Sequence, residues 1–180
     1  MSGTPARKDV CCNTEVAKFL GEALSLGTLR YSVRVLRFKV NEYNEIRGHG
    51  EETYPHECCG ILLGTAQGDV RSVEATLRCG NARTDSPQNR YNIDPRELVR
   101  AQRQAQERGL DIVGFYHSHP DHPARWSQTD FEEAHWIGCS YVITSVEKGK
   151  AAVTNSFALT GTKEEDKALV EEEVAISNWQ

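Results

Sequence analysis

Hydrophobic and polar residues follow one another in two patterns along this chain. A repeat of two residues, rich in β-branched and aromatic side chains, is typical of half-buried strands, and short unbroken apolar runs are typical of buried ones. These patterns predict strands over residues 34–40, 59–63, 70–77, 112–116, 140–146 and 151–159. Because helical patterns lie between several of these strands, we expect an α/β fold in which helices pack on a curved mixed sheet.

Three segments carry helical patterns with recognisable ends, and they cover residues 41–53, 94–109 and 127–138. The second has the clearest ends, because Asp94 can cap it, Pro95 suits its first position and Gly109 can end it. In the first segment, Asn41 is the expected cap and Pro55 stops the helix.

The two ends of the chain carry weaker patterns. Residues 1–31 form an N-terminal extension, residues 32–160 form the expected domain, and residues 161–180 form an acidic tail. In that tail, Glu171 to Glu173 suit a solvated helix face or a frayed end. We therefore expect one folded domain between two peripheral segments.

The composition agrees with one small globular domain. The 180 residues are 38% hydrophobic, which is enough to form a core, and the net charge of −5 gives no support for nucleic-acid binding. There is neither an apolar run of membrane-spanning length nor a signal peptide. We therefore expect a cytoplasmic protein with no membrane partner.

The chain has six cysteines, which are Cys11, Cys12, Cys58, Cys59, Cys79 and Cys139. They include two adjacent pairs but no C-x-x-C spacing, which excludes a zinc ribbon. In a cytosolic chain the expected state is a free, mostly buried thiol. Cys58 or Cys59 could reach the site described next, but a small strand residue is the better interpretation of both.

Two histidines stand at the end of the apolar run over residues 112–116. Side chains on a strand alternate between its faces, so His117 and His119 point to the same side. Pro120 cannot donate to a sheet ladder, so the strand should end there and leave both imidazoles at its rim. Two imidazoles and a carboxylate from the next element form a three-ligand set that leaves a fourth position for water, as in a catalytic zinc site.

The carboxylate candidate is Asp130, which lies in a segment with a second interpretation. Ser127 and Asp130 match a helix capping box, and alone they would indicate only the start of a helix. A single histidine on an apolar strand is likewise more often a structural residue than a ligand. The histidine pair beside the Ser-x-x-Asp element favours a metal site, and an Asp in the first helical turn can both cap and bind.

A hydrolytic zinc site also needs a base. Glu57 opens an apolar run, where a buried carboxylate is unfavourable without a task or a partner. The chain has this Glu with a nearby Cys-Gly-Ile-Leu-Leu-Gly, then His-Ser-His-Pro, and Ser-x-x-Asp after the seven residues from Pro120 to Trp126. In these features it resembles the JAMM (MPN-plus) zinc metalloprotease family, most closely the compact prokaryotic branch that resembles sulfur-carrier-processing peptidases. The resemblance extends from about Arg34 to Leu159.

The resemblance implies a single-domain, cytidine-deaminase-like JAMM fold within residues 32–160. It also implies that His117, His119 and Asp130 hold one catalytic Zn²⁺, that Glu57 is the general base and acid, and that Ser127 stabilises the oxyanion. Zinc would lower the pKa of its water to about 7 and polarise the scissile carbonyl. Trp126 stands where many relatives have proline, a departure that bears on the shape of the loop over the site.

The implied reaction is hydrolysis of an amide bond after the Gly-Gly tail of a small ubiquitin-like sulfur-carrier protein. Two alternatives stay open: a deconjugase that removes a ubiquitin-like modifier from lysine, and a non-catalytic MPN-type scaffold, a class that usually lacks the ligands. A zinc deaminase is disfavoured because its Pro-Cys-x-x-Cys signature is absent. The sequence leaves the oligomeric state open, a homodimer included, and His49 and His56 are expected at the surface.

Overall fold

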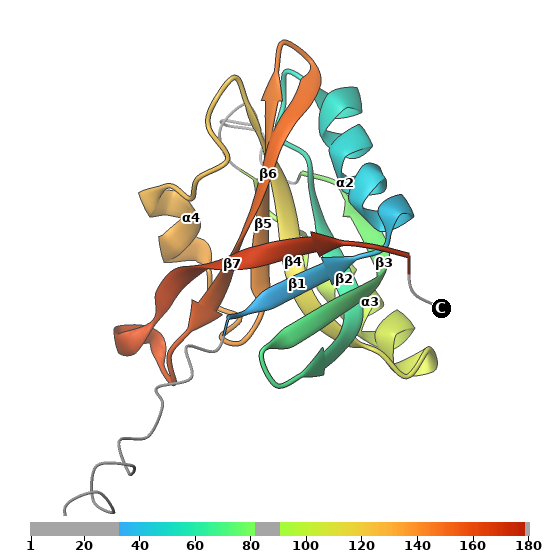
Figure 1. Ribbon diagram of the computed structural model, residues 1–180, viewed down its shortest axis with the longest axis vertical. Coiled ribbons are helices and arrows are strands. Elements are labelled where there is room, and N and C mark those ends of the chain that lie inside the picture. The colour runs from blue at the N-terminus through green and yellow to red at the C-terminus, as the bar shows by residue number, and fades with distance from the viewer. Residues whose placement is uncertain (1–32, 82–90, 179–180) are drawn as a thin grey trace, which may run out of the picture. The chain divides into compact units, whose positions relative to one another are not determined.

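The computed structural model of the protein describes residues 33–81 and 91–178, so the N-terminal extension and most of the loop at 80–90 lie outside the described residues. The elements, shown in Figure 1, are β1 (Val35–Phe38), α2 (Val40–Thr53), β2 (Cys59–Gln67), β3 (Val70–Cys79), α3 (Pro95–Glu107), β4 (Asp111–Pro120), α4 (Gln128–Glu133), β5 (Ser140–Glu147), β6 (Lys150–Thr160), a 3-10 turn (Glu164–Asp166) and β7 (Ala168–Ile176).

The described strands form a closed barrel in the order β1-β3-β2-β4-β5-β6-β7. β1 pairs in parallel with both β3 and β7, and this double pairing closes the barrel. β4 lies between β2, which is antiparallel to it, and β5, which is parallel to it. The predicted α/β class with a curved mixed sheet is confirmed.

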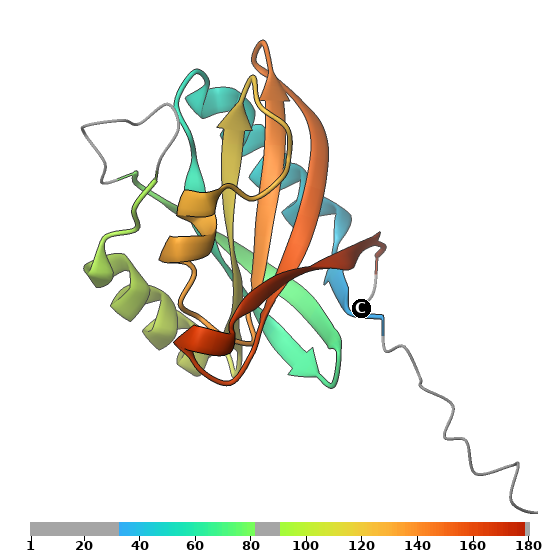
Figure 2. The ribbon, with the colours of Figure 1, turned by 90° about the vertical axis from the view of Figure 1, so that its left-hand side faces the viewer.

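Two apolar clusters cover opposite faces of the central strands. Residues of β2 and β4 alternate between them, since Ile61 and Phe115 belong to one cluster, while Leu62 and Tyr116 belong to the other. The first cluster includes Ala101 and Ala105 of α3, and the second includes Ile46 of α2. Figure 2 shows α4 in front of the strands and α2 behind them. Strand β4 is therefore enclosed on both faces, as its apolar sequence predicts.

The ends of α3 follow the sequence signals closely. The Asp94 side chain accepts a hydrogen bond from the backbone N–H of Arg96, Pro95 occupies the first turn, and Gly109 adopts the left-handed conformation (φ 66°) beyond the last turn. A side-chain acceptor at the cap is a usual partner of the free N–H groups of the first turn, and a left-handed glycine is a usual way for a helix to end. None of the helices in the described part of the chain is long and apolar enough to span a membrane.

Gly114 marks the closest approach between β4 and β5. A Cβ atom at this position would lie 2.5 Å from the carbonyl oxygen of Ser140, its partner in the parallel ladder. Because backbone atoms in a ladder cannot move aside, only glycine fits at this position. Gly114 therefore allows β4, which carries the histidines, to pair with β5 without a bulge.

The prediction for the C-terminal segment is wrong. Residues Ala168–Ile176 form strand β7, which pairs with β6 and β1, instead of a solvated helix face or frayed end. The acidic run alternates across the barrel wall: Glu171 and Glu173 are exposed, and Glu172 is buried. The Glu172 carboxylate accepts a hydrogen bond from Ser156 Oγ (2.7 Å) and lies 3.6 Å from Arg71 Nη1. The inward-facing residue of β7 is thus Glu172 with its polar partners, whereas sequence patterns identify a strand by an apolar residue at such a position.

Three smaller predictions also differ from the structure. The cap of α2 is Lys39, whose side chain makes no capping bond, because the helix begins at Val40 and places Asn41 inside it. Helix α4 ends at Glu133, ahead of the predicted Gly138. His49 is buried instead of exposed, since its Nδ1 lies 2.9 Å from the Tyr116 hydroxyl. His56 is exposed, as predicted.

Candidate metal centre

The two histidines lie side by side on β4, in the interior of the sheet. His117 pairs with Cys59 of β2 and Ile143 of β5, and only 2% of its side chain is exposed. His119 is 12% exposed, and the strand ends at Pro120, as predicted. His117 is therefore deeper than the rim position expected from the sequence, because β2 pairs with β4 as far as His117 and β5 pairs with it as far as Pro120.

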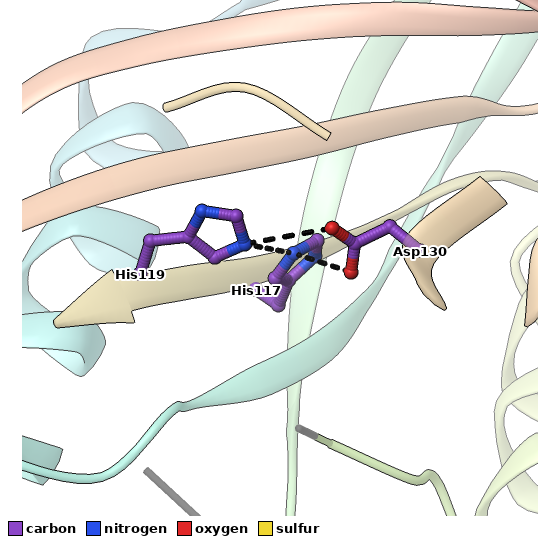
Figure 3. A group of neighbouring side chains, drawn as sticks. All are labelled: His117, His119 and Asp130. Atoms are coloured by element: carbon purple, nitrogen blue, oxygen red, sulfur yellow. Dashed lines mark hydrogen bonds and ion pairs between the residues drawn. The ribbon is translucent and has the colours of Figure 1, made fainter. Parts of the chain in front are cut away.

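Asp130 reaches the histidines from the first turn of α4. Figure 3 shows the three side chains pointing toward one another, the imidazoles from the strand and the carboxylate from the helix. The Nε2 atoms of His117 and His119 are 3.1 Å apart, and the Asp130 oxygens lie 3.3 Å from the first and 3.6 Å from the second. One ligand atom from each residue falls within a group that spans no more than 4.8 Å.

Asp130 also caps its own helix, and this cap is compatible with a carboxylate that faces the histidines. The backbone N–H of Ser127 donates to Asp130 Oδ2 (2.6 Å), and Ser127 Oγ accepts from the backbone N–H of Asp130 (3.2 Å). This reciprocal pair is the predicted capping box. It fixes the Asp130 carboxylate relative to β4 and leaves the hydroxyl hydrogen of Ser127 free to serve as a donor.

The tautomer of His119 follows from its second ring nitrogen. Nδ1 lies 2.9 Å from the carbonyl oxygen of Pro123. A carbonyl oxygen only accepts hydrogen bonds, so Nδ1 carries a proton, and Nε2, which faces Asp130, is the nitrogen that a metal ion would use in the neutral ring. This is the protonation that a metal-binding imidazole needs.

The ionisation of the cluster also favours a cation. Burial of Asp130 disfavours its charged form, but hydrogen bonds from His117 and His119 outweigh it and hold the pKa of the carboxyl well below its usual range. Burial lowers the pKa of the His117 imidazole. Burial also disfavours the charged form of His119, but its hydrogen bonds to Asp130 and to the Pro123 carbonyl outweigh burial and raise its pKa. An ionised carboxylate that faces two imidazole nitrogens favours a positive charge between them, and a bound metal ion would supply it.

Glu57 stands two residues before the start of β2 and is 4% exposed. The β2–β4 ladder begins at the pair Cys59 and His117, and its register continued by two residues would set Glu57 opposite His119, whose charge acts on it. Burial raises the pKa of Glu57 to about 8, while His119 lowers it and Asp130 raises it further. The structure thus brings the predicted base beside the predicted ligands, with an affinity for protons in the range that acid and base catalysis uses.

The cysteines beside Glu57 have structural positions. The backbone N–H of Cys58 donates to Ser118 Oγ (2.9 Å), and its side chain packs in the cluster that contains Leu62, on the opposite face from the histidines. Cys59 packs with Ile61 on the histidine face. Both thiols are free and buried, and burial raises their pKa values. Cys59 is a small strand residue, as predicted, whereas Cys58 lies just before β2.

One residue of the site has no signal in the sequence. The ring of Tyr91 stacks on the imidazole of His117, with centroids 4.5 Å apart and planes 25° from parallel. Tyr91 follows a polar loop without a repeat, so only the fold shows that it reaches β4. It also lines a cavity of about 370 Å³ that adjoins the histidines, together with Asn92, Ile93, Leu98, Phe115, Glu133, His135, Trp136 and Tyr141.

The donor set fits zinc better than a hard cation. Two neutral imidazoles and one carboxylate are typical of catalytic zinc sites, whereas Mg²⁺ and Ca²⁺ prefer oxygen ligands alone. The Nε2 atoms of His117 and His119 are 3.1 Å apart, so one ring can donate to the other in the appropriate tautomer. With both Nε2 atoms deprotonated, a cation shared by His117, His119 and Asp130 would take the place of this bond.

Comparison with known families agrees with this geometry. Residues 40–160 match the family described as prokaryotic homologs of the JAB domain. The chain belongs to this family. The matched region runs from the start of α2 to the end of β6 and contains Glu57, both histidines and the Ser127–Asp130 element.

Two curated relatives match about half of the chain. Desampylase from Haloferax volcanii is 41% identical over 91 residues, which are 51% of this chain and 63% of that protein. A probable TtuB-protein conjugate cleaving protease from Thermus thermophilus is 35% identical over 92 residues, which are 51% of this chain and 58% of that protein. The matches therefore span less than two thirds of either relative.

Two solved structures have the same fold over most of the chain. Protein DSY2949 from Desulfitobacterium hafniense has a TM-score of 0.69 and 32% identity, and the match covers 80% of this chain and 94% of that one. A protein from Salinibacter ruber has a TM-score of 0.59 and 40% identity, with coverage of 79% and 92%. The closed barrel with its flanking helices is thus a shared architecture.

Proposed function

We propose that the protein is a zinc-dependent hydrolase that cuts the amide bond after the C-terminal Gly-Gly tail of a small ubiquitin-like carrier protein. The convergence of His117, His119 and Asp130 beside the buried Glu57 carries this proposal. The family membership and the names of the two curated relatives support it.

Each residue has a role that its surroundings suit. His117, His119 and Asp130 would hold the zinc ion, which when bound supplies a Lewis acid that activates water and polarises a carbonyl. Glu57 takes the proton of the attacking water and returns it to the leaving amine, a step that its raised pKa favours. Ser127 donates its hydroxyl hydrogen to the oxygen on which negative charge develops. No side chain becomes acylated, so we expect no covalent intermediate.

The substrate is inferred from chemistry and from the relatives. A Gly-Gly tail has no side chains, so it can approach a metal centre on a strand that is enclosed by β2 and β5. The cavity lined by Tyr91, Phe115 and Trp136 offers an apolar surface next to His117 for the residues that precede the glycines. We infer a protein partner with such a tail, and neither a nucleic acid nor a membrane surface.

The second candidate reaction is removal of a ubiquitin-like modifier from lysine. The relative from Thermus thermophilus is named for cleavage of conjugates, which favours this candidate. Both reactions use the same residues and differ only in the amine that leaves. The distinction therefore depends on which substrates the chain accepts.

The test uses two substrates made from one Gly-Gly-tailed carrier. One has a linear C-terminal extension, and the other is joined through an isopeptide bond to the Nζ of a lysine peptide. We expect cleavage after the second glycine of the linear fusion, loss of cleavage with a chelator, and recovery on addition of Zn²⁺. Cleavage of the isopeptide alone would assign the deconjugase reaction. Zinc binding without cleavage of either substrate would contradict both and favour the scaffold.

A further inference from the structure

The loop between His119 and Ser127 is held by hydrogen bonds to three successive carbonyl groups. The carbonyl of His122 accepts from the hydroxyl of Ser145 (2.8 Å), and the carbonyl of Ala124 accepts from Nδ2 of Asn155 (2.9 Å). Between them, the carbonyl of Pro123 accepts from Nδ1 of His119 (2.9 Å). The oxygen that orients the imidazole is thus flanked on both sides by carbonyls that the barrel wall fixes.

The two donors, Ser145 and Asn155, lie on β5 and β6, the two strands that follow β4 in the sheet. Ser145 of β5 is the ladder partner of His119, and Asn155 lies on β6, which is paired with β5. Ser145 is only 3% exposed, so its hydroxyl has few other partners. The methyl group of Ala124 is buried against Ile143 and Phe157, which keeps the loop on the same wall.

A further anchor stands at the start of the loop. The backbone N–H of Asp121 donates to the carbonyl of Val146 (2.9 Å), and its carboxylate accepts from the backbone N–H of Lys148 and from the hydroxyl of Tyr54, both at 2.8 Å. Asp121 has a φ of 52°, which turns the chain sharply after Pro120. The loop therefore leaves β4 in a fixed direction before it reaches Pro123.

We propose that Ser145 and Asn155 are positioning residues for the metal ligand His119. By fixing the carbonyls of His122 and Ala124, they keep the Pro123 oxygen where His119 Nδ1 can donate to it, and so keep Nε2 turned toward Asp130. This inference rests on the zinc site of the proposed function. It gives Ser145 and Asn155 a part in metal affinity, although both lie outside the Glu, His-x-His and Ser-x-x-Asp motif.

The physical basis is the cost of leaving the imidazole free to rotate. Partners of the second ring nitrogen set the tautomer and the orientation of a ligating histidine, and their loss typically weakens metal binding about 10–100-fold. Asn155 is outside the cluster of His117, His119 and Asp130 and donates to the loop at Ala124. An effect of Asn155 on zinc affinity would therefore pass through the loop instead of a contact with the ion.

The test measures zinc affinity, by competition with a chelating dye, for the full chain and its variants. Ser145→Ala and Asn155→Ala should each weaken zinc binding about 10–100-fold. Ser145→Thr keeps the hydroxyl and should restore affinity to near the wild-type value. Asn155→Asp, which is equal in size but cannot donate, should behave like Asn155→Ala and covers the case in which the alanine variant folds poorly.

A matched control and a spectroscopic signal separate positioning from general loosening. Thr160 lies on the same strand as Asn155, and its Oγ1 donates to the backbone carbonyl of Ala168 (3.0 Å). Thr160→Val removes this side-chain bond and should leave zinc affinity unchanged. In Co²⁺-substituted protein, the visible ligand-field bands should shift for Ser145→Ala and Asn155→Ala but not for Thr160→Val.

Zinc affinities within twofold of the wild type for both alanine variants, with unshifted cobalt bands, would overturn the inference. A chain that binds zinc but cleaves no carrier would contradict the proposed function, while the affinity ratios would still test the role of Ser145 and Asn155. A wild-type chain that binds no zinc would overturn both.

Discussion

At the scale of single residues, each polar group of the site has two tasks. Asp130 caps α4 and faces the histidines, and Ser127 accepts one hydrogen bond while keeping a hydrogen to donate. Glu57 is buried with a raised pKa, a combination that is frequent at functional sites. All five residues were candidates from the sequence, because their types and spacing suit the chemistry of a metal site.

Replacement of Glu57 tests whether the base is separate from the metal ligands. Glu57→Gln should keep zinc, because Glu57 is not a ligand, and should lower kcat/KM about 10²–10⁴-fold, the usual contribution of a general acid and base. The measurement is steady-state cleavage of the carrier fusion together with metal content. Asp94→Asn, which changes an exposed helix cap, is the control and should keep activity. Near-normal turnover of Glu57→Gln would show that another group is the base.

The raised pKa of Glu57 also predicts how stability depends on pH. In the metal-free protein, the folded state keeps the proton up to about pH 8, while the unfolded chain releases it near pH 4.5. The folded state therefore holds more protons between these values, so the free energy of unfolding should fall as the pH rises from 4.5 to 8. Denaturant titrations of chelated protein should show this fall, of roughly 2–5 kcal/mol. Glu57→Gln should flatten it, and an unchanged slope in that variant would contradict the assignment.

At the scale of elements, the site depends on how β4, α4 and the start of β2 are joined. The starts of α3 and α4 agree with the sequence prediction because capping is local chemistry, whereas α4 ends five residues before the predicted Gly138. The depth of His117 was not predicted, because it depends on pairing with β2 and β5, which the sequence of β4 does not encode by itself. Tyr91 and the carbonyl of Pro123 were missed for the same reason.

The two tasks of Ser127 can be separated by substitution. Ser127→Gly should preserve α4, because glycine is an acceptable cap that differs from serine by only a few tenths of a kcal/mol. Its activity should nevertheless fall about 10²–10³-fold, because the donor to the oxyanion is gone. Ser127→Thr keeps both the cap and the donor, and should keep both stability and activity. Thermal unfolding measures the effect on stability, and kcat measures the effect on the reaction. A fully active Ser127→Gly variant would show that Ser127 does not stabilise the oxyanion.

At the scale of the whole molecule, β7 was the main error, because this unpredicted strand pairs with β1 and closes the curved mixed sheet into a barrel. The run of three glutamates obscured the strand, because the residue that faces inward is charged instead of apolar. Its partners, Arg71 on β3 and Ser156 on β6, are distant in the sequence, so no local pattern announces them.

Glutamates of β7 should differ sharply in their contribution to stability. Glu172→Ala leaves Arg71 buried without its carboxylate and should lower the free energy of unfolding by about 3–5 kcal/mol. Glu171→Ala and Glu173→Ala change exposed positions of the same strand, and each should stay within about 0.5 kcal/mol of the wild type. Chemical denaturation of the three variants measures this, and equal effects would contradict the alternation of β7 across the barrel wall.

The central claim is that His117, His119 and Asp130 hold one catalytic zinc ion. The most direct measurement is elemental analysis of protein equilibrated with zinc and then dialysed. We predict about one zinc ion per chain for the wild type and for Glu57→Gln, and less than about a tenth of an ion for His119→Ala. Stoichiometric zinc in His119→Ala, or none in the wild type, would contradict the account.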